Sequence, residues 1–216
     1  MLQDPLRRVS ALTGAASRRG TDALLGLLTT KIPLPRSVAD RRLVLVGASV
    51  GLAWRLHLVF PNVRTLDEYR FDKTGPLARA IALRPDAIIL KECAAYFPSS
   101  GDVDTALVEQ WVEQIRRAGI RPVLATVVPV TAEHARRAPG RQEGLTSFND
   151  WLRGYAAGED VPLLDLEQAL RISAADRHLD DRLDSGDGLH LAWQTYRRHL
   201  DPLIPPLLLR TFVDPR

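Results

Sequence analysis

Three residue types that together carry out nucleophilic catalysis stand at two places in the chain. Ser49 follows a short apolar run that ends in Gly47, and Asp187 precedes His190 by three residues in a polar segment. A serine hydroxyl becomes a nucleophile when a histidine accepts its proton, and a carboxylate can orient that histidine. The three-residue spacing lets the carboxylate reach the imidazole within one loop or helical turn. These three side chains are therefore our candidates for a catalytic set.

Each of these features alone also fits an ordinary structural role. A serine between a strand and a helix often caps the helix, and an aspartate before a helix does the same. The chemical interpretation of Ser49 therefore depends on whether the fold brings it to His190. The other histidines lack such a setting: His57, His134, His178 and His199.

Strand-like and helix-like segments alternate from residue 42 onward. Apolar runs bounded by glycine or proline predict strands at 43–46, 63–66, 86–90, 120–128 and 162–166. Amphipathic patterns predict helices at 50–60, 76–83, 104–118, 146–157 and 191–198. This alternation indicates an α/β fold with a mainly parallel, five-stranded sheet. Ligands of such sheets bind beyond the carboxyl ends of the strands, where Ser49 is expected to lie.

A serine after the first strand and an Asp-x-x-His motif before the last helix resemble the GDSL or SGNH hydrolase family over residues 42–200. The family's Gly-Asp-Ser block matches Gly47-Ala48-Ser49, and its last block matches Asp187–His190. The resemblance implies a flavodoxin-like, three-layer α/β sandwich and an esterase or deacylase. Ser49 would attack the carbonyl, His190 would be the general base, and Asp187 would orient it. It implies a small ester or acylated substrate, and neither a cofactor nor a metal.

The resemblance also assigns an oxyanion hole, and here the chain departs from the family. Gly75 is the best match to the family's second-block glycine, whose N–H group is a donor. Where the family has Gly-x-Asn-Asp, the chain reads Lys91-Glu92-Cys93, so Glu92 stands about where the asparagine amide belongs. An ionised carboxylate cannot donate a hydrogen bond, and loss of one oxyanion donor typically lowers turnover ~100- to 1000-fold.

The sequence leaves three outcomes open at this block. Glu92 is protonated, Lys91 supplies the missing positive charge, or the site has lost ordinary esterase activity. We interpret Cys93 as a small buried packing residue rather than a nucleophile.

Two other functions stay open. The altered segment Lys91-Glu92-Cys93 also fits a non-catalytic binding protein of the same fold. The segment 47–51 resembles the glycine-rich turn of short-chain dehydrogenases, with Asp67 or Glu68 near the position of the ribose-binding acid. Tyr69 and Lys73 even have Tyr-x-x-x-Lys spacing, but they come too early in the chain for the catalytic helix of that family. Residues 47–51 also match the G-x-S-x-G motif of α/β-hydrolases. In that family the serine follows a strand that comes later in the sequence than the first strand.

Charge and composition exclude several other classes. The 216 residues include 29 Lys and Arg against 26 Asp and Glu, a formal charge of +3, and the arginine pairs are spread along the chain. This balance argues against a nucleic-acid binder. One cysteine excludes an intramolecular disulfide and a cysteine-built zinc site.

No apolar stretch approaches the roughly 20 residues that span a bilayer. Charged residues interrupt the N-terminal segment, so we expect no signal peptide and a cytoplasmic protein. Residues 1–40 are expected to form a partly helical extension, with a helix at 21–29, and residues 41–216 the hydrolase-like domain.

Overall fold

Five parallel strands form the sheet in the computed structural model, which describes residues 32–97 and 104–213. The strands lie in the order β2-β1-β3-β4-β5. Their bounds are β1 Leu43–Gly47, β2 Val63–Asp67, β3 Ala87–Lys91, β4 Arg121–Ala125 and β5 Leu163–Leu164. All four neighbouring pairs are parallel, with Val46 of β1 beside Leu90 of β3. The predicted parallel sheet is therefore confirmed, although β5 is shorter than predicted.

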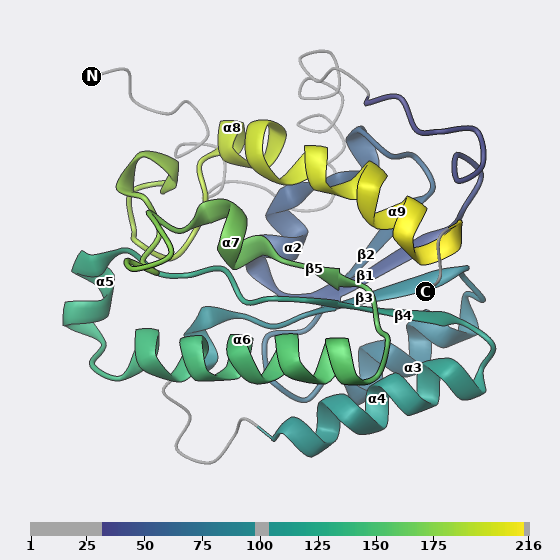
Figure 1. The fold of residues 1–216 in the computed structure, drawn as a ribbon, viewed down its shortest axis with the longest axis horizontal. Coiled ribbons are helices and arrows are strands. Elements are labelled where there is room, and N and C mark those ends of the chain that lie inside the picture. Colours follow the sequence, from purple (N-terminus) through teal and green to yellow (C-terminus); the bar gives the residue numbers. More distant parts are fainter. Residues whose placement is uncertain (1–31, 98–103, 214–216) are drawn as a thin grey trace, which may run out of the picture.

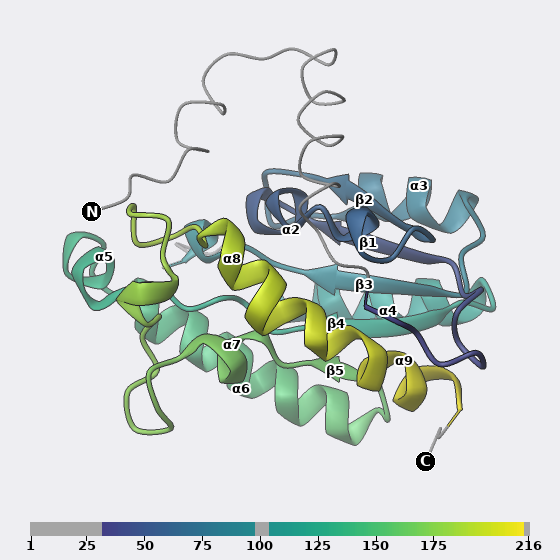
Figure 2. The same ribbon diagram turned by 90° about the horizontal axis from the view of Figure 1, so that it is seen from above.

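Helices cover both faces of the sheet and make three layers (Figure 1). The described helices are α2 Ser49–Trp54, α3 Thr74–Ala82, α4 Thr105–Arg117, α5 Ala132–Arg137, α6 Arg141–Gly158, α7 Leu166–Leu170, α8 Trp193–Thr195 and α9 Ile204–Phe212. Helices α2, α7, α8 and α9 lie on one face, and α3, α4 and α6 lie on the other (Figure 1). A view from above shows the run from α8 to α9 passing across the sheet (Figure 2).

Strand β1 separates two hydrophobic cores. Leu43 and Leu45 belong to the core under α2, α7 and α9, whereas Val44 and Val46 belong to the core under α3, α4 and α6. Successive side chains of a strand point to opposite faces, so a strand covered on both faces must be apolar throughout. This requirement explains the continuous apolar run that precedes Ser49.

The helix predicted at 50–60 is shorter in the structure. Helix α2 ends at Trp54 because Arg55 adopts a left-handed conformation (φ 47°), and a separate 3-10 turn follows at Leu56–Leu58. A left-handed residue is a common way for a helix to end. The sequence gives little warning, since arginine rarely takes this conformation.

No element is predicted between the strand at 120–128 and the helix at 146–157, but the structure has α5 there, and α6 begins at Arg141, before the predicted start. The Thr131 side chain accepts the N–H group of His134 and so caps α5, and α6 begins after Gly140, whose φ is 80°. Strand β4 is also shorter than the predicted 120–128. The side-chain oxygen of Asn149, in α6, accepts the N–H group of Val127 and replaces a strand partner there.

The C-terminal helix continues beyond its predicted end. After α8 come a π-helical turn at Tyr196–Leu200, a 3-10 turn at Asp201–Leu203 that contains Pro202, and then α9. Proline lacks the N–H group that the helix interior needs. The tighter 3-10 turn at Pro202 agrees with this restriction.

The predicted helix at 21–29 lies outside the described residues, but part of the predicted extension is packed. Val38 is fully buried in the core that contains β1 and α9, and Ile32 and Leu34 pack against that core. The hydrophobic core therefore reaches back into the segment before residue 41.

Candidate active site

Ser49 is the first residue of α2, and only Ala48 separates it from the end of β1. It lies at the carboxyl end of the sheet, where a parallel sheet places its ligands. Gly47 lies beside the end of the neighbouring strand, since a Cβ atom there would be in ordinary contact with the Lys91 carbonyl oxygen at 3.5 Å. The Ser49 side chain is partly exposed and so is accessible to a ligand.

A chain of short contacts joins Ser49, His190 and Asp187. His190 Nε2 lies 2.9 Å from Ser49 Oγ, and His190 Nδ1 lies 2.7 Å from Asp187 Oδ2. The other carboxylate oxygen, Asp187 Oδ1, accepts the N–H groups of Leu189 at 2.9 Å and His190 at 2.8 Å. The fold therefore brings together two segments that are 141 residues apart in the chain.

Electrostatics keep Asp187 ionised. Partial burial by itself would raise its pKa, but the N–H groups of His190 and Leu189 and the His190 ring outweigh that effect and hold the pKa at about 2. A carboxylate only accepts hydrogen bonds, so Nδ1 of His190 carries the proton. Nε2 is then free to accept the hydroxyl proton of Ser49, which is the arrangement that activates a serine.

The loop that carries Asp187 and His190 is fixed by contacts that the sequence analysis did not identify. Asp184 accepts the N–H groups of Gly186 at 2.7 Å and Gly188 at 2.9 Å. Gly188 has φ +78°, and a Cβ atom there would lie 2.5 Å from Thr131 Oγ1. The Asp-x-Gly spacing typical of tight turns is the signal that would have pointed to Asp184.

His134, for which the sequence offers no setting, contacts this loop. His134 Nδ1 lies 3.1 Å from the carbonyl oxygen of Asp187, and its Nε2 lies 2.5 Å from Arg141 Nη1. Arg141 in turn donates from Nε to the carbonyl oxygen of Phe97 at 2.5 Å. Because arginine only donates, Nε2 of His134 accepts and Nδ1 donates to Asp187. Helix α5 and Arg141 thus tie the Asp187 loop to the segment after β3.

Glu92 forms a buried ion pair with Lys73. Lys73 Nζ lies 2.9 Å from Glu92 Oε2, and the two side chains are 1% and 6% exposed. Lys73 also donates to the carbonyl oxygens of Arg70 and Phe71. Burial raises the pKa of Glu92 to about 7, and the positive charges of Lys73 and Lys91 only partly oppose it. The sequence shows both residues but gives no sign that they pair across 19 positions.

Lys91, the last residue of β3, is also buried, and its Nζ donates to the backbone carbonyl oxygen of Glu92 at 2.8 Å. Burial lowers the pKa of Lys91. No hydrogen bond joins Lys91 or Glu92 to Ser49 or His190 in the described part of the chain, so their oxyanion roles stay predictions. Cys93 is buried, in agreement with its expected packing role.

Gly75 is exposed in the first turn of α3. A Cβ atom built on Gly75 would come within 4 Å only of Arg79 Nη1, at 3.8 Å, in its own helix. No hydrogen bond joins Gly75 to Ser49 among the described residues, and the oxyanion role of Gly75 also stays a prediction. Among the described residues, no group of three or more His, Cys, Asp and Glu side chains is arranged to hold a metal ion.

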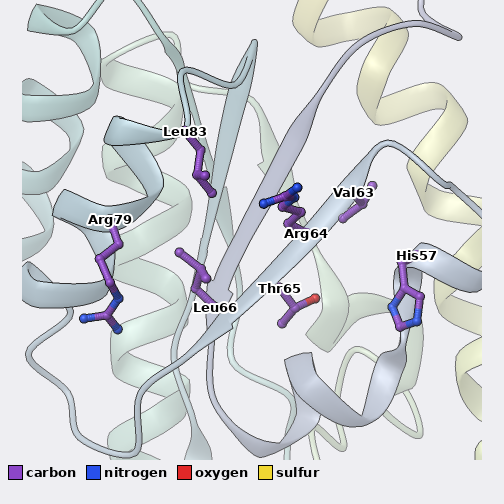
Figure 3. Close-up of a pocket in the computed structure, with 7 residues that line it drawn as sticks. All are labelled: His57, Val63, Arg64, Thr65, Leu66, Arg79 and Leu83. Carbon is purple, nitrogen blue, oxygen red and sulfur yellow. The ribbon is translucent and has the colours of Figure 1, made fainter. Parts of the chain in front are cut away.

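A shallow hollow of about 610 Å³ lies along edge strand β2 and is lined by residues that include His57, Arg64, Thr65, Arg79 and Leu83 (Figure 3). Ser49, Asp187 and His190 do not line it. This hollow therefore does not belong to the candidate active site. No helix in the described ranges is long and apolar enough to cross a membrane.

A model of the GDSL-like lipase/acylhydrolase family matches residues 34–198. The chain belongs to this family of acylhydrolases and esterases. The predicted family is thus confirmed, and the match includes Ser49, Asp187 and His190. No curated protein matches the chain significantly. The dehydrogenase alternative loses its support, because Tyr69 is 60% exposed while Lys73 is buried against Glu92.

Several solved structures share the fold. A GDSL-like lipase from Bacteroides thetaiotaomicron aligns over 88% of this chain and 97% of its own, with 17% identity and a TM-score of 0.64. A lipase/acylhydrolase from Enterococcus faecalis aligns over 77% and 94%, with 19% identity and a TM-score of 0.58. An acetyl xylan esterase from Geobacillus stearothermophilus aligns over 81% and 95%, with 12% identity and a TM-score of 0.57. At these identities the likeness shows the SGNH hydrolase fold alone.

Proposed function

We propose that this acylhydrolase cleaves a small ester or acylated substrate with Ser49 as nucleophile, His190 as general base and Asp187 as the residue that orients it. The single observation that carries the proposal is the continuous contact from Asp187 Oδ2 through His190 to Ser49 Oγ, with distances of 2.7 and 2.9 Å. Both lie within normal hydrogen-bond range. The ordinary capping roles open to Ser49 and Asp187 would not require this contact.

The reaction follows from the proton positions. His190 Nε2 accepts the Ser49 proton as Oγ attacks the carbonyl carbon, and the imidazolium then protonates the leaving alcohol. Asp187 stabilises the positive charge that His190 gains. In the second half, His190 takes a proton from the water that attacks the acyl-enzyme, and the imidazolium then returns a proton to Ser49 Oγ as the acid product leaves. Every proton is thus accounted for by His190 alone.

The oxyanion of the tetrahedral intermediate is assigned to the N–H group of Ser49 and, by resemblance to the family, to that of Gly75. Lys91 or Glu92 takes the third position. The N–H group of Ser49 is well suited to this role, because it lies beside the reacting oxygen and at the start of α2. No step in this scheme uses a metal or a cofactor.

Labelling with a fluorophosphonate probe tests the nucleophile. We expect the wild-type chain to be labelled and to hydrolyse p-nitrophenyl acetate, and Ser49→Ala to do neither. Ser173→Ala is a matched control, because Ser173 is exposed and its hydroxyl accepts the N–H group of Asp176 away from this site. Unchanged labelling of Ser49→Ala would reject the assignment. A wild-type chain that is neither labelled nor active would favour the non-catalytic alternative.

A further inference from the structure

The Lys73–Glu92 ion pair lies at the same end of the sheet as Ser49. Val46 and Leu90 are paired across β1 and β3, and Ser49 and Glu92 follow the ends of these neighbouring strands by two residues and one residue. Gly47 is beside Lys91, as the 3.5 Å approach to the Lys91 carbonyl oxygen shows. Glu92 is thus placed next to the start of α2 by the strand register itself.

Lys73 determines which oxygen of Glu92 is available. Its ammonium group donates to Glu92 Oε2 and to the carbonyl oxygens of Arg70 and Phe71, which uses all three N–H bonds. Because Oε2 accepts from Lys73, a proton on the carboxyl group belongs on Oε1. No other described side chain or backbone group is hydrogen-bonded to Oε1, so a proton there has no acceptor within the described part of the chain.

The charged groups around Glu92 come from three elements. Lys73 and Asp72 precede α3, Lys91 ends β3, and Tyr96 lies in the 3-10 turn after it, with Lys73 Nζ 4.8 Å from the centre of its ring. Burial is the main reason that the pKa of Glu92 rises to about 7, and Asp72 adds to the rise. Both protonation states are therefore populated near neutral pH.

We propose that protonated Glu92 donates the third hydrogen bond of the oxyanion hole from Oε1, and that Lys73 is a positioning residue that holds Oε2 and so directs the proton to Oε1. This inference rests on the proposed function, because it needs the oxyanion that forms when Ser49 attacks. It explains how a glutamate occupies the position that the family gives to an asparagine amide. Ionised Glu92 would accept only, and would repel the oxyanion.

Comparison of the pH profiles of the wild type and Glu92→Gln tests the donor. Above about pH 7, wild-type kcat/KM should fall about tenfold per pH unit as the proton is lost. Glutamine keeps the shape, and its amide oxygen should face Lys73, which leaves the NH₂ group to donate at every pH. We therefore expect Glu92→Gln to lack the alkaline decrease and to exceed the wild type at pH 9 by about tenfold or more.

Lys73 variants test the positioning role. Lys73→Met removes a positive charge beside Glu92, so the alkaline decrease should move to higher pH, whereas Lys73→Arg should leave it near its wild-type position. A purely structural role for Lys73 would lower activity equally at all pH values. Thermal unfolding of each variant identifies any that fail to fold, and Lys73→Arg with Glu92→Gln then decides the question.

Fluorophosphonate labelling at pH 6 and pH 9 separates the two proposals. If Ser49 is labelled but the wild type and Glu92→Gln have superimposable pH profiles, the inference about Glu92 is overturned and the proposed function stands. If neither chain is labelled or active, the proposed function fails and the inference fails with it. An alkaline decrease that disappears in Glu92→Gln supports both.

Discussion

Two groups of charged side chains, the Asp187–His190 loop and the buried Lys73–Glu92 cluster, are built in opposite ways. In the Asp187–His190 loop the partners are three residues apart and half-exposed, with side-chain exposures of 49% and 35%. In the buried cluster, Lys73 and Glu92 are 19 residues apart and nearly inaccessible. The first group gets its geometry from a local turn and the second from the strand register, so they should respond differently to substitution.

The difference has an energetic consequence. Charges in the loop stay in contact with water, so removal of one alters chemistry more than stability. Charges in the buried cluster lose their hydration and depend on each other, so removal of one leaves the other uncompensated. The comparison predicts large catalytic effects on the loop side and large stability effects on the buried side.

The largest expected effect is that of Asp187→Asn on turnover. The asparagine amide donates to Nδ1 of His190 and moves the ring proton to Nε2, the nitrogen that must accept from Ser49. A fall in kcat of about 10⁴-fold is expected, by analogy with the same change in a serine protease. Steady-state hydrolysis of p-nitrophenyl acetate measures it.

Asp176→Asn is the matched control for that change. His178 Nδ1 lies 2.8 Å from Asp176 Oδ1, which resembles the contact in the catalytic loop, but no hydroxyl lies on the other nitrogen in the described part of the chain. Its kcat should equal that of the wild type. A comparable fall in both variants would mean that the effect is structural.

The next effect is the destabilisation caused by Lys73→Met. A buried carboxylate without its partner typically costs about 3–5 kcal/mol of folding free energy. Urea unfolding at pH 8 should show a loss of this size, and a second change, Glu92→Gln, should recover most of it. Arg70→Met, which breaks the exposed pair of Arg70 with Glu68, should cost only about 0–1 kcal/mol. Equal losses in Lys73→Met and Arg70→Met would remove the distinction between the two groups of charges.

The same contrast explains what could be predicted from the sequence. A period-2 or period-3.6 pattern and a three-residue spacing are local, so the strands, the family and the Asp187–His190 pair are evident from the residues. The Lys73–Glu92 pair depends on how the segment after β2 folds back over β3, which no local pattern encodes. The left-handed Arg55 and the cap at Thr131 likewise result from tertiary packing, so the extent of α2 and the existence of α5 were missed.

Gly188→Ala should have a smaller effect on the loop side. A Cβ atom there would lie 2.6 Å from His134 Cβ and 2.5 Å from Thr131 Oγ1, in a backbone with φ +78°. Strain and overpacking together should cost about 2–4 kcal/mol and lower kcat, because the Asp187 loop must move. Thermal unfolding and steady-state kinetics measure the two effects.

Gly119→Ala isolates the backbone contribution. Gly119 has φ +72°, but nothing lies within 4 Å of a Cβ atom at that position. Its cost should be about 1 kcal/mol, from strain alone, and its kcat should be unchanged. If Gly188→Ala and Gly119→Ala are equally stable, the packing of α5 does not hold the Asp187 loop in place.

The two carboxyl groups also differ in how they make stability depend on pH. The pKa of Asp187 is lowered to about 2, so its contribution to stability is complete above its ordinary pKa of 3.8 and is lost as pH falls toward 2. The pKa of Glu92 is raised to about 7, so the folded state binds the extra proton and stability decreases as pH rises from 4.5 to 7. Unfolding free energies from pH 2 to pH 8 should therefore show a flatter acid limb in Asp187→Asn and a flatter limb between pH 4.5 and 7 in Glu92→Gln. If Glu92→Gln instead leaves the slope between pH 4.5 and 7 unchanged, Glu92 does not titrate in that range, and the two groups do not differ in the way their charges are held.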